Sequence, residues 1–296
     1  MSSAPNDGAL AGLIRDAARA GFELRPLTRY CGAEIMGLDL SATLAAPVVA
    51  GLRAALAERG VLFFREQTLT PQRQAALARQ FGEIVVNPIY EHVAGHPEVM
   101  PVVKEANDQY NIGDTWHSDM SYMPQPPLGS MLYARELPPY GGDTLFVNMT
   151  AVYEHLSDGM KGFLDGRRAV HSDRFLSDRR DERNAGRSTR LREDLTARIE
   201  ALHPVVRTHD ESGRKALFVN GPFTWAFEGM TREESRPILD ELMAQAMHPE
   251  FGCRFRWSPG ALAFWDNRCA LHYACNDYHG FRREMHRVTI AGGVPV

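Results

Sequence analysis

Cysteine is scarce in this chain of 296 residues, and long apolar runs are missing. The four cysteines are Cys31, Cys253, Cys269 and Cys275. None of them forms a C-x-x-C pair, so we interpret them as reduced thiols rather than as a disulfide framework. No stretch of about 18 apolar residues occurs, and residues 1–7 do not combine a basic region with an apolar one. We therefore expect a cytoplasmic protein with no export signal and no membrane span.

An excess of charge of either sign is also missing. Lysine and arginine together number 33, against 37 aspartate and glutamate residues, which gives a net charge of -4. This balance provides no overall attraction to nucleic acid or to an anionic membrane. Hydrophobic residues make up 44% of the chain, which is enough for a sizeable core. We expect the partner to be a small molecule.

Repeats are missing as well, and the most unusual composition lies at 167–198. Arginine is interleaved there with aspartate and glutamate. Such mixed charge favours a solvated loop and helix, although a phosphate-binding surface is an alternative. Because the segment follows a predicted strand near the candidate site, we expect it to form a lid or insert over the substrate.

The first part of the chain predicts mixed α and β structure. The predicted elements are helices at 10–20, 48–59 and 70–81 and strands at 22–27, 33–40 and 61–65. Thr70 and Pro71 mark the start of the third helix, because threonine is a good N-cap and proline fits the first helical position.

Short β-like runs dominate from Pro127 onward. They cover 129–135, 143–148, 169–172, 205–208, 215–220, 253–257, 261–265 and 283–291. Many short strands separated by turn signals indicate a sandwich or jelly roll, so the predicted fold class is mainly β with flanking helices. Helices are expected at 151–164 and 231–247, and Thr231 with Glu234 has the capping-box pattern at the start of the second.

The tripeptide His117-Ser118-Asp119 predicts a metal site. In an extended strand, side chains at i and i+2 point to the same face, so this imidazole and carboxylate could bind one ion. His272 could supply a third ligand. Two histidines and one carboxylate suit non-haem Fe(II) oxygenases. Cys269 and Cys275 lie on either side of His272, so a thiolate ligand is an alternative. A second tripeptide, His171-Ser172-Asp173, shows that the spacing alone does not decide.

Five longer motifs resemble the taurine dioxygenase family of Fe(II)- and 2-oxoglutarate-dependent oxygenases, over residues 24–295. They are W-H-S-D at 116–119, E-L-P-P-Y-G-G-D-T at 136–144, L-H-P-V-V-R-T-H at 202–209, W-D-N-R-C-A-L-H-Y-A at 265–274 and R-R-E-M-H-R at 282–287. The resemblance implies a double-stranded β-helix, a form of jelly roll, as a single domain over 1–296. It also implies that His117, Asp119 and His272 bind iron, and it places His171 outside the metal site.

The same resemblance implies that the protein uses Fe(II), 2-oxoglutarate and O2 and releases succinate and CO2. The far carboxylate of 2-oxoglutarate needs a cationic partner, and the planar fork of arginine suits a carboxylate. Arg283 matches the family arginine in that role, and Thr144 matches the hydroxyl that assists it.

Strand alternation adds an inference about the primary substrate. Arg283 and Arg287 share one face of the last strand, so we expect a second arginine beside the same cavity. In the family, the residue that matches Arg287 holds the substrate's sulfonate, which predicts an anionic substrate; a structural salt bridge is the alternative. Tyr90 and Phe223 match further pocket residues.

Two pocket positions depart from taurine dioxygenase. Asn87 replaces a histidine, and Gly113 replaces an asparagine. These changes disfavour taurine without excluding it, and another sulfonate, a sulfate ester, or a carboxylate such as an aryloxy acid fits the pattern as well. Family members are often homo-oligomers, so we expect a dimer or a tetramer.

Other reactions fit part of this pattern. Hydroxylation is the expected outcome, and desaturation or cyclisation on the same scaffold is an alternative. A zinc hydrolase could use the same two histidines and aspartate, but no H-E-x-x-H helix is present, and Arg283 with Thr144 would lack a purpose. A jelly-roll protein that binds metal without turnover is the remaining alternative.

Overall fold

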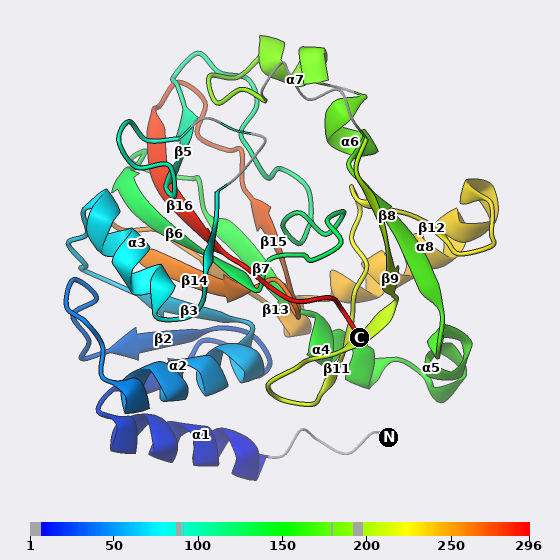
Figure 1. The fold of residues 1–296 in the computed structure, drawn as a ribbon, viewed down its shortest axis with the longest axis horizontal. Helices are drawn as coiled ribbons and strands as arrows, with labels where there is room; N and C mark the ends of the chain where they lie inside the picture. The colour runs from blue at the N-terminus through cyan, green and yellow to red at the C-terminus, as the bar shows by residue number, and fades with distance from the viewer. Residues whose placement is uncertain (1–6, 87–89, 91, 179, 192–197) are drawn as a thin grey trace.

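The computed structural model describes residues 7–86, 90, 92–178, 180–191 and 198–296, and its largest sheet has eight strands (Figure 1). These strands are β1 (Glu23–Pro26), β2 (Ala33–Met36), β3 (Val61–Phe64), β4 (Ile84–Val85), β5 (Met100–Lys104), β6 (Gly129–Glu136), β14 (Leu262–Asp266) and β16 (Arg283–Ile290). Their order is β1-β2-β3-β14-β6-β16-β4, and β5 also pairs with β16.

Three smaller sheets complete the β structure. They are formed by β13 (Gly252–Phe255), β7 (Thr144–Asn148) and β15 (Ala270–Ala274); by β12 (Thr224–Phe227), β8 (Arg168–Ser172) and β9 (Glu200–Pro204); and by β10 (Val206–Thr208) and β11 (Lys215–Leu217). Buried aromatic rings join the β13-β7-β15 sheet to the large sheet: Phe63 of β3 lies 5.5 Å from Phe146 of β7 and 4.0 Å from Phe255 of β13, between ring centroids. Two sheets packed in this way form the predicted jelly roll.

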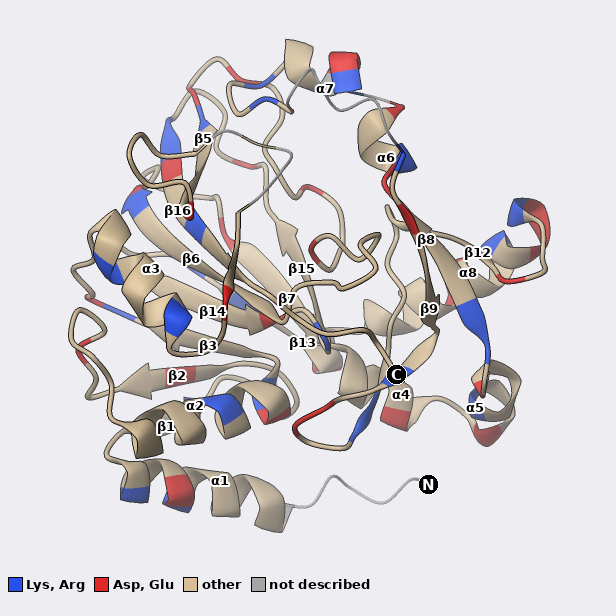
Figure 2. Cartoon of the chain, in the orientation of Figure 1, with Lys and Arg blue, Asp and Glu red and all other residues tan. Residues whose placement is uncertain are grey.

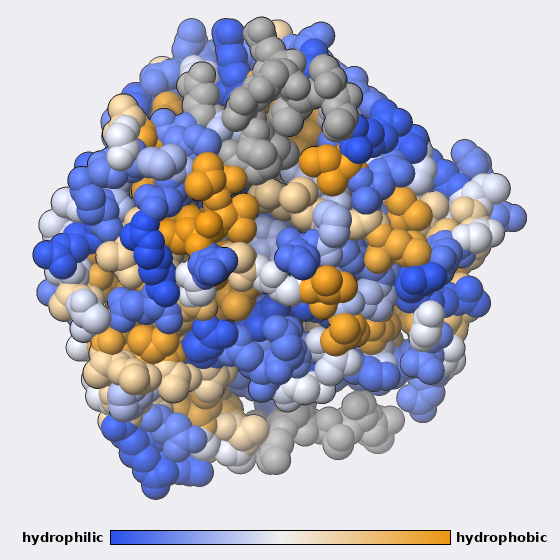
Figure 3. Space-filling view, in the orientation of Figure 1, coloured by the Kyte–Doolittle hydropathy of each residue, from blue (hydrophilic) through white to orange (hydrophobic). Residues whose placement is uncertain are grey.

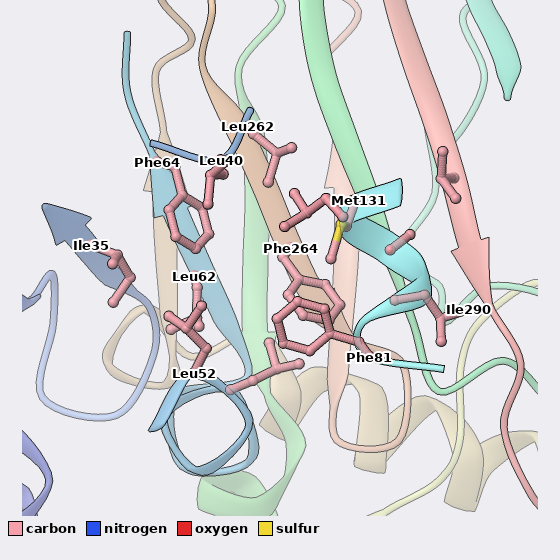
Figure 4. Packing of buried hydrophobic residues seen from close by; sticks show 14 of the residues in the cluster. Ile35, Leu40, Leu52, Leu62, Phe64, Phe81, Met131, Leu262, Phe264 and Ile290 are labelled. Atoms are coloured by element: carbon pink, nitrogen blue, oxygen red, sulfur yellow. The ribbon is translucent and has the colours of Figure 1, made fainter. Parts of the chain in front are cut away.

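Helices cover the outer face of the large sheet. They are α1 (Asp7–Ala20), α2 (Ala46–Arg59) and α3 (Pro71–Arg79). Figure 4 shows Leu52 of α2 packed near Leu62 of β3, and Phe81 beside Phe264 of β14, with ring centroids 4.9 Å apart. Burying each such side chain stabilises the fold by roughly 1.5–3 kcal/mol. This cluster therefore holds β3, β14 and β16 in place.

The remaining α-helices lie away from these three. They are α4 (Met149–His155), α5 (Asp158–Leu164), α6 (Arg174–Ser177), α7 (Arg180–Ala185) and α8 (Arg232–Ala246). Figure 1 shows α6 and α7 at the top of the view and α5 and α8 at the right. The predicted caps are confirmed: Thr70 accepts a hydrogen bond from Arg73 N, and Thr231 with Glu234 forms a complete capping box.

Several sequence predictions about elements were wrong. The single helix expected at 151–164 is two helices, because Leu156 is extended and Ser157 caps the second. Strands β5, β9, β12 and β15 were not predicted. The strand expected at 33–40 ends at Met36.

The surface in Figure 3 is mixed, with separate apolar patches among hydrophilic side chains. In the described part of the chain, no helix combines the length and the apolar character that crossing a membrane requires.

Candidate metal centre and adjoining cavities

Three side chains far apart in the sequence meet at one buried point. Nε2 of His117 and Nε2 of His272 lie 3.7 and 3.8 Å from the same oxygen, Oδ1 of Asp119. The two imidazole centroids are 4.1 Å apart, and each of the three residues is less than 10% exposed. One ligand atom from each residue lies within 4.8 Å of the others, which is close enough for a single ion.

The local backbone explains how His117 and His272 come together. Their backbones form a bridge in which His117 N donates to His272 O at 3.1 Å and His272 N donates to His117 O at 2.9 Å. His117 therefore pairs with β15 as a single residue, and Asp119 lies in the turn that follows, next to Met120 with φ of 49°. The prediction that the tripeptide lies on a strand was wrong, although its two side chains do converge.

Neighbouring residues orient the Asp119 carboxylate. Ser130 Oγ donates to Oδ2 at 2.8 Å, and Arg287 Nη1 donates to Oδ1 at 3.1 Å. Asn267 Oδ1 accepts from Asp119 N at 3.2 Å and from Trp265 Nε1 at 3.0 Å. Partners of this kind fix the direction of a metal ligand before the ion arrives.

The protonation states suit metal binding. Burial opposes ionisation of Asp119, but Arg287 and the two histidines hold its carboxyl pKa well below the usual range. Burial lowers the pKa of both His117 and His272. An ionised carboxylate and two neutral imidazoles are the forms that bind a metal. This set of two nitrogens and one oxygen matches the donors of the non-haem Fe(II) facial triad.

A first cavity extends from these ligands toward Thr144 and Arg283. It is lined by His117, His272, Thr144, Arg283 and Arg287. Arg283 is 4% exposed, and its Nε and Nη2 have no hydrogen-bond partner in the structure. Trp257 Nε1 donates to Thr144 Oγ1 at 3.0 Å and so closes one wall. Leaving two nitrogens of a buried guanidinium without hydrogen-bond partners is costly, and a carboxylate would satisfy them.

A second cavity also adjoins the ligands. His117, Asp119 and Arg287 line it together with Tyr90 and Phe223, the two aromatic residues named as substrate-pocket candidates from the sequence. Further lining residues, which the sequence did not single out, are Ile112, Met120, Tyr122, Leu176 and Arg187; Phe175 and Gly113 line it too. Asn87 lies outside the described residues.

The second tripeptide has a different environment. His171 is fully buried on β8, its Nδ1 lies 3.0 Å from Ser121 Oγ, and its ring stacks on Phe218. Burial lowers its pKa to about 3. Among the described residues, His171 and Asp173 belong to no cluster of three metal-ligating side chains.

A further cluster of possible ligands, His209, Asp266 and Cys269, is occupied by other interactions. Arg268 Nε and Nη2 donate to the two oxygens of Asp266 at 2.9 and 2.7 Å, and His209 Nε2 lies 3.0 Å from Oδ2. The arginine takes the place that an ion would occupy, so this cluster is a buried ion pair that holds the turn after β14.

Comparison with known proteins supports the geometry. The family model described as "Taurine catabolism dioxygenase TauD, TfdA family" matches residues 23–289. An α-ketoglutarate-dependent sulfate ester dioxygenase from Pseudomonas putida is 34% identical over 278 residues, which are 93% of this chain and 91% of that protein.

Two further relatives cover nearly the whole chain. An α-ketoglutarate-dependent 2,4-dichlorophenoxyacetate dioxygenase from Cupriavidus pinatubonensis is 35% identical over 89% of this chain and 96% of that protein. The crystal structure of a taurine dioxygenase from Burkholderia xenovorans matches with a TM-score of 0.79 and 37% identity, covering 93% of this chain and 91% of that one.

Proposed function

Because the chain belongs to the TauD/TfdA family and is an Fe(II)- and 2-oxoglutarate-dependent dioxygenase, we propose that it hydroxylates a small organic anion. The observation that carries this proposal is that the candidate ligands line two cavities, each of which also contains a buried arginine. One cavity is suited to the cosubstrate and the other to the substrate.

In this proposal, His117, Asp119 and His272 hold the iron. Fe(II), when bound, couples the O2-dependent conversion of 2-oxoglutarate into succinate and CO2 to oxidation of the substrate. Arg283 binds the far carboxylate of 2-oxoglutarate, assisted by Thr144. Support comes from the unpartnered nitrogens of Arg283 and from the cavity that joins it to the two histidines.

The substrate cavity favours an anion with an apolar body. Arg287 supplies positive charge, while the rings of Tyr90, Tyr122 and Phe223 supply apolar walls. Relatives are named for sulfate esters, sulfonates and aryloxy acids, and such compounds combine one negative charge with an alkyl or aryl group. We extend this substrate class to the present protein, with hydroxylation as the outcome.

Broader features belong to the same proposal. We expect a single domain over 1–296 and a cytoplasmic homo-oligomer, a dimer or tetramer, that binds neither nucleic acid nor membrane. The family resemblance and the balanced charge of the chain support these expectations.

Succinate release tests the function. Protein reconstituted with Fe(II) and 2-oxoglutarate is given hexyl sulfate, hexanesulfonate, taurine or 2,4-dichlorophenoxyacetate in air. At least one anion should increase succinate release, and protein loaded with Zn(II) should give none. A preparation that never consumes 2-oxoglutarate with any of these acids would contradict the proposal. Release of hexanol from hexyl sulfate by the Zn(II) form would instead indicate a hydrolase.

A further inference from the structure

Arg187 is a buried cation in the substrate cavity for which the mechanism above has no role. It is 4% exposed and lines the same cavity as His117, Asp119 and Arg287. Its Nε and Nη2 are buried without a hydrogen-bond partner, and its Cζ lies 5.9 Å from the centroid of Tyr90. An unpaired guanidinium at such a position is costly unless an anion arrives to share the charge.

Other arginines of the same region have carboxylate partners nearby. Arg174 pairs with Glu200 at 2.9 Å, and Arg198 pairs with Asp178 at 2.6 Å. Figure 2 likewise shows acidic and basic residues side by side on α7. Within the described ranges, Arg187 forms no ion pair. The mixed charge of 167–198 favoured a solvated loop and helix, but Arg187 is buried in the structure.

The backbone on either side of Arg187 is firmly held. We call residues 184–191 the strap. Gly186 O accepts from Gln109 N at 2.9 Å and from Tyr110 N at 3.2 Å. A Cβ on Gly186 would lie 2.7 Å from the Tyr110 ring, so a larger residue there would force this partly exposed ring to move.

Hydrogen bonds continue after the arginine. Ser188 N and Oγ donate to the two oxygens of Asp108 at 2.9 and 3.0 Å. Thr189 Oγ1 donates to Val103 O at 2.8 Å and accepts from Val103 N at 2.9 Å. The strap is therefore fixed immediately before and after Arg187, which holds the backbone of Arg187 beside the cavity without using its charge. Preorganisation of this kind favours binding.

The other arginine of the cavity is already partly neutralised. Arg287 Nη1 donates to Asp119 at 3.1 Å, and its Nη2 lies 3.4 Å from Met100 Sδ. Arg287 therefore has a carboxylate partner in the structure, whereas Arg187 has none among the described residues. Arg187 is the cation that gains most from a bound anion.

We propose that Arg187 is a specificity-determining residue that binds the anionic group of the primary substrate, an organic monoanion with an apolar body. The inference rests on the proposed function and deepens it, because it assigns a second arginine, carried by the strap, to the substrate cavity. It also gives the strap at 184–191 a role in completing the pocket.

Calorimetry under anaerobic conditions tests this proposal without turnover. Protein with Fe(II) and 2-oxoglutarate is titrated with hexyl sulfate and 2,4-dichlorophenoxyacetate, and with the neutral counterparts hexanol and 2,4-dichlorophenoxyethanol. Arg187→Gln should weaken binding of the anions about 10- to 100-fold, the usual size of a charged hydrogen bond, and leave the neutral compounds unchanged. Arg187→Lys should recover part of the affinity, because it restores the charge.

Arg190→Gln is the matched control, since it removes an exposed arginine from the same strap. It should bind like the wild type. An arginine with only a structural role would lower the melting temperature when replaced, whereas Arg187→Gln should not lower it, because the change removes an uncompensated buried charge. The Kd for 2-oxoglutarate should stay within about twofold in all variants, a control for folding.

Unchanged anion binding in Arg187→Gln would overturn the inference, as would equal weakening in Arg187→Gln and Arg190→Gln. A wild type that releases succinate but binds none of the anions would also overturn it, while the dioxygenase activity stands. Loss of anion binding in Arg187→Gln together with absent 2-oxoglutarate turnover in the wild type would support the anion site and contradict the reaction.

Discussion

The two oxygens of Asp119 have different partners, and this asymmetry matters at the scale of single residues. Oδ2 accepts from Ser130, whereas Oδ1 faces Arg287 and both histidines. Oδ1 is therefore the oxygen directed at the ion, and Ser130 keeps the carboxylate from rotating. Removing any of the three ligands should cost more affinity than removing a residue outside this arrangement.

Metal binding by two histidine variants tests this arrangement. His117→Ala should abolish Fe(II) binding and the weak visible absorption of the anaerobic complex with 2-oxoglutarate, because it removes a ligand. His171→Ala is a matched control from the second H-x-D tripeptide and should keep both signals, since His171 contacts Ser121 and Phe218 instead. Loss of the band in the His171 variant alone would show that the wrong tripeptide was assigned.

Residue chemistry explains which parts of the site were predictable. Imidazole and carboxylate groups bind metals by themselves, so His117, Asp119 and His272 stood out within their motifs. Ser130 has an ordinary side chain in an unremarkable context, and Arg187 is one of many arginines at 167–198, whose composition does not distinguish it. Ser130 acquires its role through the pairing of β6 with β14 and β16, and Arg187 through the fixed strap. Spatial neighbours of this kind leave no local pattern in a sequence.

At the scale of elements, β16 serves both cavities. Arg283 and Arg287 lie on the same face of this strand. Both line the first cavity, as strand alternation predicted. Only Arg287 also lines the second. Four residues along one strand are enough to separate the two proposed anion sites, because each residue advances the chain by about 3.3 Å.

Replacing Arg287 and replacing Arg283 should raise the KM of different substrates. Arg287→Gln should raise the KM of the best acid in the succinate assay about tenfold or more while changing that of 2-oxoglutarate much less; Arg283→Gln should do the reverse. Each variant serves as the control for the other, since both remove a buried arginine from the same strand. Parallel increases in both KM values for both variants would remove the separation.

Element prediction succeeded where local signals were strong. The helix starts at Thr70 and Thr231 carry their own capping residues, and the structure contains both caps. The tripeptide at 117–119 was wrongly placed on a strand, because a single bridge to β15 gives the same i and i+2 convergence as a strand does. Short strands such as β9 and β12 were missed, since pairing with β8 rather than composition defines them.

At the scale of the whole molecule, buried histidines outside the candidate metal site couple folding to pH, among them His171 and His203. His171 and His203 pack together with ring centroids 5.3 Å apart. Burial lowers the pKa of His171 to about 3 and also lowers that of His203. An unfolded chain protonates its histidines near pH 6.5, so below that pH the unfolded state binds more protons than the folded state. Stability must therefore fall as pH decreases from about 6.5 toward the folded pKa values.

Replacement of His171 should flatten this dependence. The free energy of unfolding of the metal-free wild type should fall below about pH 6.5 by up to about 1.4 kcal/mol per pH unit for each such histidine. His171→Gln removes one of them, so its slope should be smaller even if its stability is lower throughout. His248→Gln, which changes an exposed histidine, should keep the wild-type slope. Guanidinium denaturation at several pH values gives the free energy of unfolding of all three proteins. Equal slopes of this free energy against pH for wild type and His171→Gln would show that the fold does not hold His171 neutral.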